Sequence, residues 1–400
     1  MPGNDVESAS RGDLRRVLTV LCATEITSWG VLFYAFPVLS AQITTTTGWS
    51  TTVVTAALSV SQLVAAIAGI PVGRRLDRHG PRAVMTAGST LGVLAIVAIA
   101  SATDLAWFFA AWILAGAAMG AVLYPPAFAA LTRWHGRDRV RALTMLTLAG
   151  GLASTVFAPL TAWLSTLLSW RETYLVLAGL LAVVTIPAHW FGLTPPWPPH
   201  PSPTPGQVHA DPGRVARSRG FLVLAASLSV AAFATFAVVI NLVPLLDERG
   251  VDAGTAAVAL GLGGAGQVAG RLGYVALARR TSVRTRTLLI LLAMGITTAM
   301  LSVLINVTAL ICAAVLAGAA RGVFTLLQAT AVTDRWGTTY YGHLTGLLSA
   351  PLTVAMAMAP FIGALLAKLL GGYATAFLLL GAVAAAAAVL SVGATPRGRR

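Results

Sequence analysis

The sequence predicts an all-α polytopic membrane protein with twelve transmembrane helices in two pseudo-symmetric six-helix bundles. Three observations predict this fold class: an apolar composition, a one-sided distribution of basic residues and an internal repeat. Hydrophobic residues occupy 57% of the 400 positions and charged residues only 10%, and the mean hydropathy is +0.80. Soluble domains carry about 25% charged residues, so we expect this chain to cover most of its surface with lipid.

Long apolar segments follow one another from Val17 to Val392. Many reach the ~20 residues that an α-helix needs to cross a bilayer. Helices satisfy their own backbone hydrogen bonds in lipid, whereas the strands of an outer-membrane barrel would alternate in polarity, which these segments do not. We predict twelve spans, at residues 17–42, 51–72, 83–102, 106–131, 142–168, 173–193, 220–246, 254–278, 287–306, 308–332, 343–369 and 374–393.

The basic residues predict the orientation of these spans. The net charge of +14 comes from 27 Lys and Arg residues against 13 Asp and Glu residues. Most of the basic residues fall in the two tails and in alternate loops, whereas the other side holds only Arg171, Arg249 and Lys368. This asymmetry follows the positive-inside rule and predicts a cytoplasmic (plasma) membrane protein with both termini in the cytoplasm. The basic residues are therefore explained by the orientation of the spans in the membrane, and we expect no nucleic-acid partner.

The predicted domains are a cytoplasmic tail at 1–16, a first bundle at 17–193, a linker at 194–219, a second bundle at 220–393 and a tail at 394–400. The linker is rich in proline and polar residues, so we expect a solvated cytoplasmic tether that is neither helical nor buried. Cys22 and Cys312 both fall inside predicted spans and give no disulfide framework.

An internal repeat relates the two bundles. "LAGAAMG" at 114–120 returns as "LAGAARG" at 316–322, which is 202 positions later. Small residues at this spacing let membrane helices pack closely. The single difference places Arg321 where the first copy has Met119.

Further matches support a duplication. Arg133 and Trp134 match Arg335 and Trp336 at the same spacing of 202, and a looser match pairs Gln62 with Gln267 at a spacing of 205. Two six-helix halves joined by a cytoplasmic linker are the architecture in which one half rocks against the other around a midplane site.

The stretch "GRRLDRHGPR" at 73–82, between the second and third predicted helices, resembles the signature loop of the major facilitator superfamily. The resemblance implies the major facilitator fold and a latch that holds the cytoplasmic face in one state. Asp77 could pair with a neighbouring arginine or lie at a helix amino terminus; alternatively, the loop is a topogenic basic loop with an incidental aspartate. The residues of the implied latch are Gly73, Asp77, Arg78, Gly80 and Arg82.

Shorter motifs resemble the monocarboxylate-transporter-like branch of that superfamily and its bacterial relatives. These motifs are "YAFP" at 34–37, "GWS" at 48–50 and "YPPAFAALTRW" at 124–134. The animal carriers of the branch have an aspartate where this chain has Gln267 and a lysine where it has Val38. Both departures set this chain apart from their proton-coupled lactate mechanism. The helix-4 arginine and helix-5 Gly-Pro motif of the drug/proton antiporters are absent.

Three ionisable residues lie well inside predicted spans: Glu25, Arg271 and Arg321. Such residues cost about 2.5–3.5 kcal/mol at a helix centre and usually face a cavity or a partner. A guanidinium stays charged and can grip a carboxylate in two places, so either arginine could attract an anionic solute. Glu25 is the candidate for proton coupling. The alternative is a structural Glu–Arg pair that neutralises buried charge.

Polar and aromatic residues could complete a solute pocket, because helices 1, 4, 7 and 10 line the central cavity in the family. Gln267 lies one turn before Arg271 on the same helical face. The predicted substrate-binding residues are Arg321, Arg271, Gln267, Tyr34, Tyr124, Asn241 and Gln328.

These observations predict a secondary active transporter of a small organic anion such as a monocarboxylate, working by alternating access and coupled to protons. The alternative is an efflux transporter for a drug or a secondary metabolite. The lone Glu25 supplies no paired carboxylates for an intramembrane enzyme, and no phosphate-binding loop for ATP occurs in the sequence. We expect no cofactor and no metal. The expected partners are the solute, protons and the lipid bilayer, and we expect a monomer.

Overall fold

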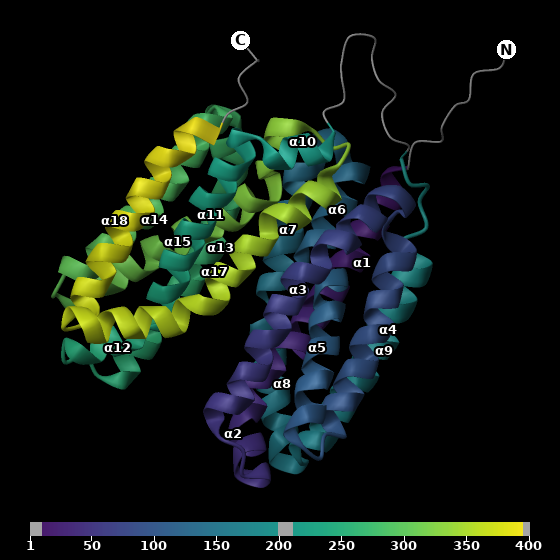
Figure 1. Ribbon diagram of the computed structural model, residues 1–400, viewed down its shortest axis with the longest axis horizontal. Coiled ribbons are helices and arrows are strands. Elements are labelled where there is room, and N and C mark those ends of the chain that lie inside the picture. The colour runs from purple at the N-terminus through teal and green to yellow at the C-terminus, as the bar shows by residue number, and fades with distance from the viewer. Residues whose placement is uncertain (1–9, 199–210, 395–400) are drawn as a thin grey trace. The chain divides into compact units, whose positions relative to one another are not determined.

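The computed structural model describes residues 10–198 and 211–394, and every regular element in these ranges is a helix (Figure 1). The chain divides into two compact units. The first comprises Met1–Val208 with Thr338–Gly346, and the second comprises His209–Gly337 with Leu347–Arg400.

The first unit contains long helices, some of them interrupted within one membrane crossing. Its elements are α1 (Arg11–Trp29), the π-helix η1 (Gly30–Tyr34), α2 (Ala35–Thr47), α3 (Thr51–His79), α4 (Pro81–Ala100), α5 (Leu105–Val122), α6 (Tyr124–His135), the 3-10 turn η2 (Gly136–Asp138), α7 (Arg139–Gly151), α8 (Ala153–Leu167) and α9 (Trp170–Gly192).

The second unit repeats this organisation. Its elements are α10 (Pro212–Arg217), α11 (Arg219–Ile240), α12 (Leu242–Glu248), α13 (Ala253–Arg280), α14 (Val283–Val303), α15 (Val307–Ala331), α16 (Thr333–Trp336), most of α17 (Tyr341–Leu370), α18 (Tyr373–Ser391) and the 3-10 turn η3 (Val392–Ala394).

The predicted fold class is confirmed. Ten of the described helical stretches are long and apolar enough to cross a membrane. One of them, Leu105–Leu167, contains two predicted spans, because α5 to α8 follow one another there. The 28-residue helix α13 matches the remaining predicted span. Together these segments account for the twelve helices expected from the sequence.

Prolines explain one of the interruptions. Helix α5 ends at Val122, and Pro125 and Pro126 lie in the first turn of α6. A proline has no N–H, so these two residues cannot donate to the carbonyl groups of Ala121 and Val122 as a continuous helix would require. In the first turn of a new helix an N–H has no intrahelical partner, so proline is tolerated there.

Large apolar side chains lie on the outside of the protein as well as in its core. Trp112 and Tyr174 are fully buried in the first unit, and Phe377 is buried in the second. Ile67 is 69% exposed and Val183 is 75% exposed. Continuous apolar exposure of this kind is expected of a surface that meets lipid.

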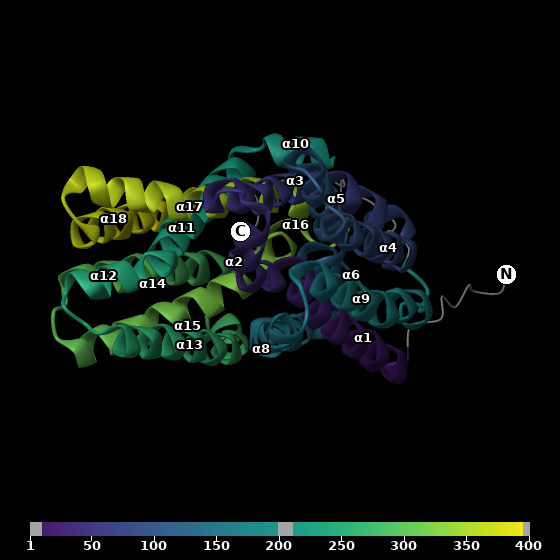
Figure 2. The same ribbon diagram turned by 90° about the horizontal axis from the view of Figure 1, so that it is seen from below.

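Neighbouring helices pack through small residues. Helices α14 and α18 lie side by side in both views (Figures 1 and 2), as do α4 and α9. A Cβ atom added to Gly295 on α14 would lie 2.9 Å from the carbonyl oxygen of Gly381 on α18. This distance is below any that real Cβ atoms show, so glycine sets how closely the two helices approach.

The predicted linker is not a solvated tether throughout. Pro212–Arg217 forms α10, and Asp211 caps it by accepting a hydrogen bond of 3.3 Å from the backbone N–H of Gly213. The expectation that the proline-rich segment forms no helix is therefore wrong there, because proline in a first turn favours a helix. Residues 194–198 pack against the first unit, with Pro195 buried.

The remaining part of the predicted linker, 199–210, lies outside the described residues, as do 1–9 and 395–400 of the predicted tails. Helix α1 begins at Arg11, within the predicted amino-terminal tail. Ser10 and Asp13 form a capping box at this helix start, in which each side chain binds the other's backbone N–H.

Candidate solute-binding site

Helices α13 and α15 of the second unit cross in backbone contact. A Cβ atom added to Gly322 on α15 would overlap the carbonyl oxygen of Gln267 on α13. A Cβ atom added to Gly270 would likewise overlap the carbonyl oxygen of Ala319. Only glycine fits at both positions, so the repeated "LAGAARG" motif forms one side of a close helix crossing.

This crossing brings Arg271 and Arg321 together. Arg271 directly follows Gly270, and Arg321 directly precedes Gly322. Arg271 is only 5% exposed, Arg321 is largely buried, and the two side chains are close enough for their charges to repel. Arg321 lies about 15 Å along the axis from the end of α15 at Ala331. Like charges repel more strongly in a buried position than they do in water.

The same crossing occurs in the first unit between α3 and α5. A Cβ atom added to Gly116 would overlap the carbonyl oxygen of Ser61, and one added to Gly120 would lie 2.9 Å from the carbonyl oxygen of Ala65. In the second unit the corresponding contacts join Gly318 to Gly263 and Gly322 to Gln267. Each partner is displaced by 202 positions, so the duplicated halves share this packing in detail.

This register corrects one match made from the sequence. Gln267 was paired with Gln62 at a spacing of 205, but its structural equivalent at the crossing is Ala65. Helices α3 and α13 both continue unbroken from the crossing to their ends at His79 and Arg280, so the Arg-Arg pairs matched at a spacing of 205 are not structural equivalents either. Sequence matching gave weight to the identical glutamines and missed the backbone contacts that define equivalence.

The corrected register identifies what the first unit has in place of the two arginines. Gly69 is equivalent to Arg271, and Met119 is equivalent to Arg321. The twin crossing forms with neither charge, so this helix packing does not require arginine. The two guanidinium groups are an addition to a scaffold that already packs without them.

The other candidates of the second unit separate into two groups. Gln267 lies one turn before Arg271, and Gln328 lies two turns after Arg321; both are half-buried. Asn241 has a different role, because it is the C-cap residue of α11. Its Nδ2 donates a hydrogen bond of 2.8 Å to the carbonyl oxygen of Ala237. The two glutamines therefore share the helices of the arginine pair, whereas the amide of Asn241 closes a helix end.

In the first unit, Glu25 lies in α1 with its side chain completely buried. Neither carboxylate oxygen has a hydrogen bond of normal geometry among the described residues. The indole of Trp29, one turn later on the same helical face, lies beside the carboxyl group. A buried carboxyl group with so few polar neighbours is costly in its charged form.

Trp29 also joins Glu25 to the two predicted tyrosines. Its ring centroid lies 5.2 Å from that of Tyr124 and 6.2 Å from that of Tyr34. Tyr124 stacks on Phe128 with a centroid separation of 5.1 Å. The structure thus brings Glu25, Tyr34 and Tyr124 into one aromatic cluster. Trp29 was not among the predicted site residues, although its spacing of four from Glu25 places both on one helical face.

The helix carrying this cluster is locally widened. Residues Gly30–Tyr34 form the π-helix η1, and the N–H of Ala35 donates to the carbonyl of Gly30, five residues back. The ring of Phe157 lies against Gly30, where a Cβ atom would not fit. Pro37 lacks the N–H that would bind the carbonyl of Phe33. Single π-turns of this kind are frequent at functional sites.

At the end of α3, the carboxylate of Asp77 binds a helix amino terminus. Its Oδ1 accepts a hydrogen bond of 2.9 Å from the backbone N–H of Gly342, and its Oδ2 accepts one of 2.8 Å from that of His343. Both N–H groups belong to the first turn of α17, in the part that groups with the first unit. Of the two interactions expected for Asp77, the structure has the helix terminus, where the dipole favours an anion.

The other residues of the implied latch form two groups: the two glycines make close packing contacts, and the two arginines lie away from those contacts. A Cβ atom on Gly73 would overlap the carbonyl oxygen of Gly342, and Gly80 adopts a φ of +79° beneath the ring of Trp197. Arg82 turns towards α9, where its Nε donates a hydrogen bond of 2.7 Å to the carbonyl oxygen of Trp190. Arg78 is exposed. Gly73, Asp77 and Gly80 therefore form one contact region.

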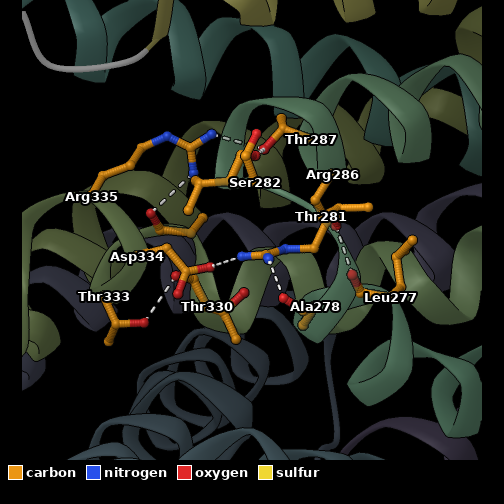
Figure 3. A network of polar contacts seen from close by, with 12 residues as sticks. Leu277, Ala278, Thr281, Ser282, Arg286, Thr287, Thr330, Thr333, Asp334 and Arg335 are labelled. Carbon is orange, nitrogen blue, oxygen red and sulfur yellow. Dashed lines mark hydrogen bonds and ion pairs between the residues drawn. The ribbon is translucent and has the colours of Figure 1, made fainter. Parts of the chain in front are cut away.

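A buried charge network occupies the corresponding end of the second unit (Figure 3). Arg286 forms an ion pair with Asp334, and their side chains are 6% and 10% exposed. Arg335 donates a hydrogen bond of 2.8 Å to the hydroxyl of Thr287. Arg335 was expected to be one of the basic residues in a cytoplasmic loop, and the network was not predicted. Here the second unit supplies a carboxylate for a buried guanidinium.

Comparison with known proteins agrees with this architecture. The family model described as Major Facilitator Superfamily matches residues 21–308 and 222–400. The chain is 29% identical over 154 residues to monocarboxylate transporter 13 of Bos taurus, covering 38% of this chain and 34% of that protein. It is 29% identical over 203 residues to the multidrug resistance protein MdtH of Klebsiella pneumoniae, covering 49% and 48%. These matches span less than half the length of either relative.

Solved structures show the same fold. The fucose:proton symporter of E. coli superposes with a TM-score of 0.72 at 15% identity, covering 94% of this chain and 97% of that one. The human organic anion transporter MFSD10 superposes with a TM-score of 0.72 at 16% identity, covering 94% and 99%.

Proposed function

Because the chain belongs to the major facilitator superfamily, we propose that this transporter carries a small organic anion, such as a monocarboxylate, by alternating access and together with protons. Family membership makes it a multi-pass membrane transporter rather than an enzyme. The observation that carries the proposal is the adjacency of Arg271 and Arg321. Two guanidinium groups at one buried helix crossing attract an anion, because each stays charged and presents a fork that matches a carboxylate.

The similarity to other carriers supports the choice of solute. One relative is named a monocarboxylate transporter, and one protein of the same fold is described as an organic anion transporter. Gln267 and Gln328, on the helices of the two arginines, add amide donors for the parts of the solute that the guanidinium groups do not bind.

Glu25 is the proposed proton carrier. Its carboxyl group is completely buried and has no hydrogen bond of normal geometry among residues 10–198. Burial favours the neutral form, so taking up and releasing a proton here would change the charge of a membrane-embedded group. The indole of Trp29 lies beside this carboxyl group, and the rings of Tyr34 and Tyr124 pack near that indole.

Alternating access is the proposed mechanism, with Asp77 as the centre of the latch. Its two hydrogen bonds to the start of α17 are contacts that one state could make and another could break. The distribution of basic residues supports a plasma membrane location with both termini in the cytoplasm. We propose that the protein works as a monomer.

Reconstitution into liposomes tests the function directly. Liposomes that contain the purified protein are loaded with an unlabelled carboxylate, and labelled carboxylate is added to the external buffer. A pH-sensitive dye trapped inside the liposomes reports the internal pH. We expect saturable counterflow accompanied by proton movement. In Glu25→Gln, counterflow should persist while the coupled change in internal pH is lost. Absence of exchange for every organic anion tested contradicts the proposal.

The similarity to a multidrug resistance protein favours a second candidate, efflux of a drug or secondary metabolite. Hydrophobic drugs are therefore included in the same counterflow assay. Exchange of drugs without exchange of carboxylates would select this alternative.

A further inference from the structure

We propose that Trp29 sets the pH at which Glu25 releases its proton, because its indole N–H is the hydrogen-bond donor that the carboxylate requires once the proton has left. This inference rests on the proposed role of Glu25 as the proton carrier and adds a positioning residue to it. The structural basis is a pair of buried polar groups one turn apart on α1, each without a hydrogen bond of normal geometry among the described residues.

The two side chains are neighbours on α1. Residues four apart lie on the same face of a helix, with their Cβ atoms about 5–6 Å from each other. The side chain of Glu25 is completely buried, and the indole of Trp29 lies beside its carboxyl group. Both carboxyl oxygens and the indole Nε1 are shielded from solvent. A small rotation of either side chain is therefore enough to form an N–H to oxygen hydrogen bond between them.

The value of this donor depends on the protonation state of Glu25. A protonated carboxyl group carries an O–H donor of its own, whereas a carboxylate can only accept, and an indole N–H can only donate. Hydrogen bonds to a charged acceptor are about twice as strong as those between neutral groups. The indole therefore stabilises the carboxylate more than the protonated form. In a buried site, an unpaired carboxylate is costly, so the donor decides how readily the proton leaves.

Aromatic packing holds the indole in place. The ring centroid of Trp29 lies 5.5 Å from that of Phe33 in an edge-to-face contact and 5.2 Å from that of Tyr124. These neighbours belong to the π-helix η1 and to α6, so two further elements fix the ring against α1. The donor is thus held beside the carboxyl group before the proton leaves.

Two other polar side chains lie one turn from Glu25 on α1. Cys22 precedes it by three residues, and Ser28 follows it by three. The hydroxyl of Ser28 is buried and, within residues 10–198, also lacks a hydrogen bond of normal geometry. Trp29 is favoured as the donor because its indole is the group that lies beside the carboxyl group.

The charged side chains of the surrounding helices lie near the helix ends. Helices α5 to α9 pack against α1. Their titratable residues, with those at the start of α1, are Arg11, Asp13, Arg15, Arg16, Tyr124, Arg133, His135, Arg139, Arg141, Arg171, Glu172, Tyr174 and His189. The charged residues and histidines of α6, α7 and α9 all fall in a first or last turn. Tyr124 is the member of this set that packs on Trp29.

An infrared pH titration of the purified full-length protein tests the inference. The difference between wild-type and Glu25→Gln spectra identifies the carbonyl band of protonated Glu25, and the loss of this band with rising pH gives the midpoint of proton release. Trp29→Phe keeps an aromatic ring but removes the N–H. Because the carboxylate then loses its donor, we expect the midpoint to rise by about 1–2 pH units.

The pH profile of lactate counterflow provides a second readout. The pH is kept equal on both sides of the liposome membrane, over a range in which lactate stays ionised. Exchange should decline as Glu25 loses its proton, and in Trp29→Phe this decline should move to higher pH by the same amount. In Glu25→Gln, exchange should not depend on pH.

The matched control is Trp112→Phe. Trp112 is fully buried in the same unit, and its Nε1 likewise has no hydrogen bond of normal geometry in the part of the chain that the structure describes. It packs on Phe36, with ring centroids 5.1 Å apart. This variant makes the same chemical change away from Glu25 and should leave the midpoint unchanged. Cys22→Ala and Ser28→Ala should also leave it close to the wild-type value.

A measurement on the wild-type protein covers the case in which gel filtration shows that Trp29→Phe does not fold. Ultraviolet resonance Raman spectra report hydrogen bonding of indole N–H groups. We expect an indole to gain a hydrogen bond as the pH is raised through the midpoint, and this change should be absent in Glu25→Gln. A spectrum that does not change with pH contradicts the inference.

The outcomes separate the inference from the proposed function. If the midpoint is the same in folded Trp29→Phe and in the wild type, the inference is wrong and Glu25 remains the proton carrier. If Ser28→Ala shifts the midpoint and Trp29→Phe does not, the donor is Ser28 and the inference is again wrong. If wild type and Glu25→Gln give identical infrared titrations and pH profiles, the proposed proton carrier and the inference fail together.

Discussion

The indole Nε1 of Trp197 donates a hydrogen bond of 3.1 Å to the backbone carbonyl oxygen of Asp77. The same ring covers Gly80 and meets Trp134 edge-to-face at 5.4 Å. Arg133 lies over its face at 5.2 Å. A residue from the start of the linker is thus built into the contact region of the signature loop.

Replacing this ring should loosen the region. We expect Trp197→Ala to destabilise the folded protein by about 1–3 kcal/mol, less than a fully buried aromatic residue because Trp197 is half-buried. The midpoint of thermal unfolding in detergent, followed by intrinsic fluorescence, measures the change. The matched control is Trp163→Ala on α8, where the side chain is 60% exposed and truncation should leave the midpoint almost unchanged.

Removing the charge of Asp77 should weaken its contact with α17. In Asp77→Asn one of the two N–H groups, of Gly342 or His343, faces an amide NH₂ instead of an oxygen. Loss of a hydrogen bond to a charged group costs about 1.5–3 kcal/mol. In a background with Cys22 and Cys312 replaced by alanine, we expect a cysteine introduced at position 343 to react faster with a water-soluble maleimide.

The control for this labelling experiment is Asp138→Asn, which removes an exposed carboxylate from the 3-10 turn η2. The labelling rate at position 343 should not change in that variant. A rate that is equally unaffected by Asp77→Asn would show that the carboxylate charge does not hold the start of α17.

The glycine crossing predicts a sharp difference between two substitutions. Gly322→Ala places a methyl group onto the carbonyl of Gln267, and we expect a loss of about 3 kcal/mol or failure of the protein to accumulate in the membrane. Gly273→Ala, on α13 but with open space around its Cβ position, should be neutral or slightly stabilising, because alanine favours a helix. Similar stability of both variants would contradict the close crossing.

The buried pair of Arg286 and Asp334 predicts non-additive effects. Asp334→Asn leaves a buried guanidinium without its counter-ion and should cost about 3–5 kcal/mol. Replacing both residues, as in Arg286→Met with Asp334→Leu, should recover much of this loss. Asp247→Asn, which removes an exposed carboxylate of α12 in the same unit, is the control and should not change the unfolding midpoint. Additive losses in the double variant would argue against direct coupling.

The fold was predictable because lipid imposes strong rules on sequence. Apolar segments of sufficient length, basic residues on one side and a duplicated motif were enough to predict a twelve-helix fold of this superfamily. The helix breaks were partly readable from Pro125 and Pro126. Helix α10 was missed although Asp211 followed by Pro212 is a helix-start signal, because the composition of the surrounding linker was given more weight.

The sequence was sufficient to identify several candidate site residues, but not to predict which of them lie next to each other. Arg271 and Arg321 stood out because charge is rare in a membrane span. Their adjacency depends on which glycines meet, and the identical Gln62 and Gln267 suggested a different register. The packing of Trp197 on Asp77 left no local pattern, because it joins positions 120 residues apart through side-chain shape.

The π-turn at Gly30–Tyr34 shifts the phase of the first membrane helix. One additional residue in a turn rotates everything after it by about 100° relative to a regular α-helix. A helical wheel drawn through Arg11–Thr47 would therefore place Tyr34 and Pro37 on the wrong side of Glu25. A cysteine scan of this segment should accordingly give two accessibility stripes, one before Gly30 and one after Tyr34, that are out of register with each other.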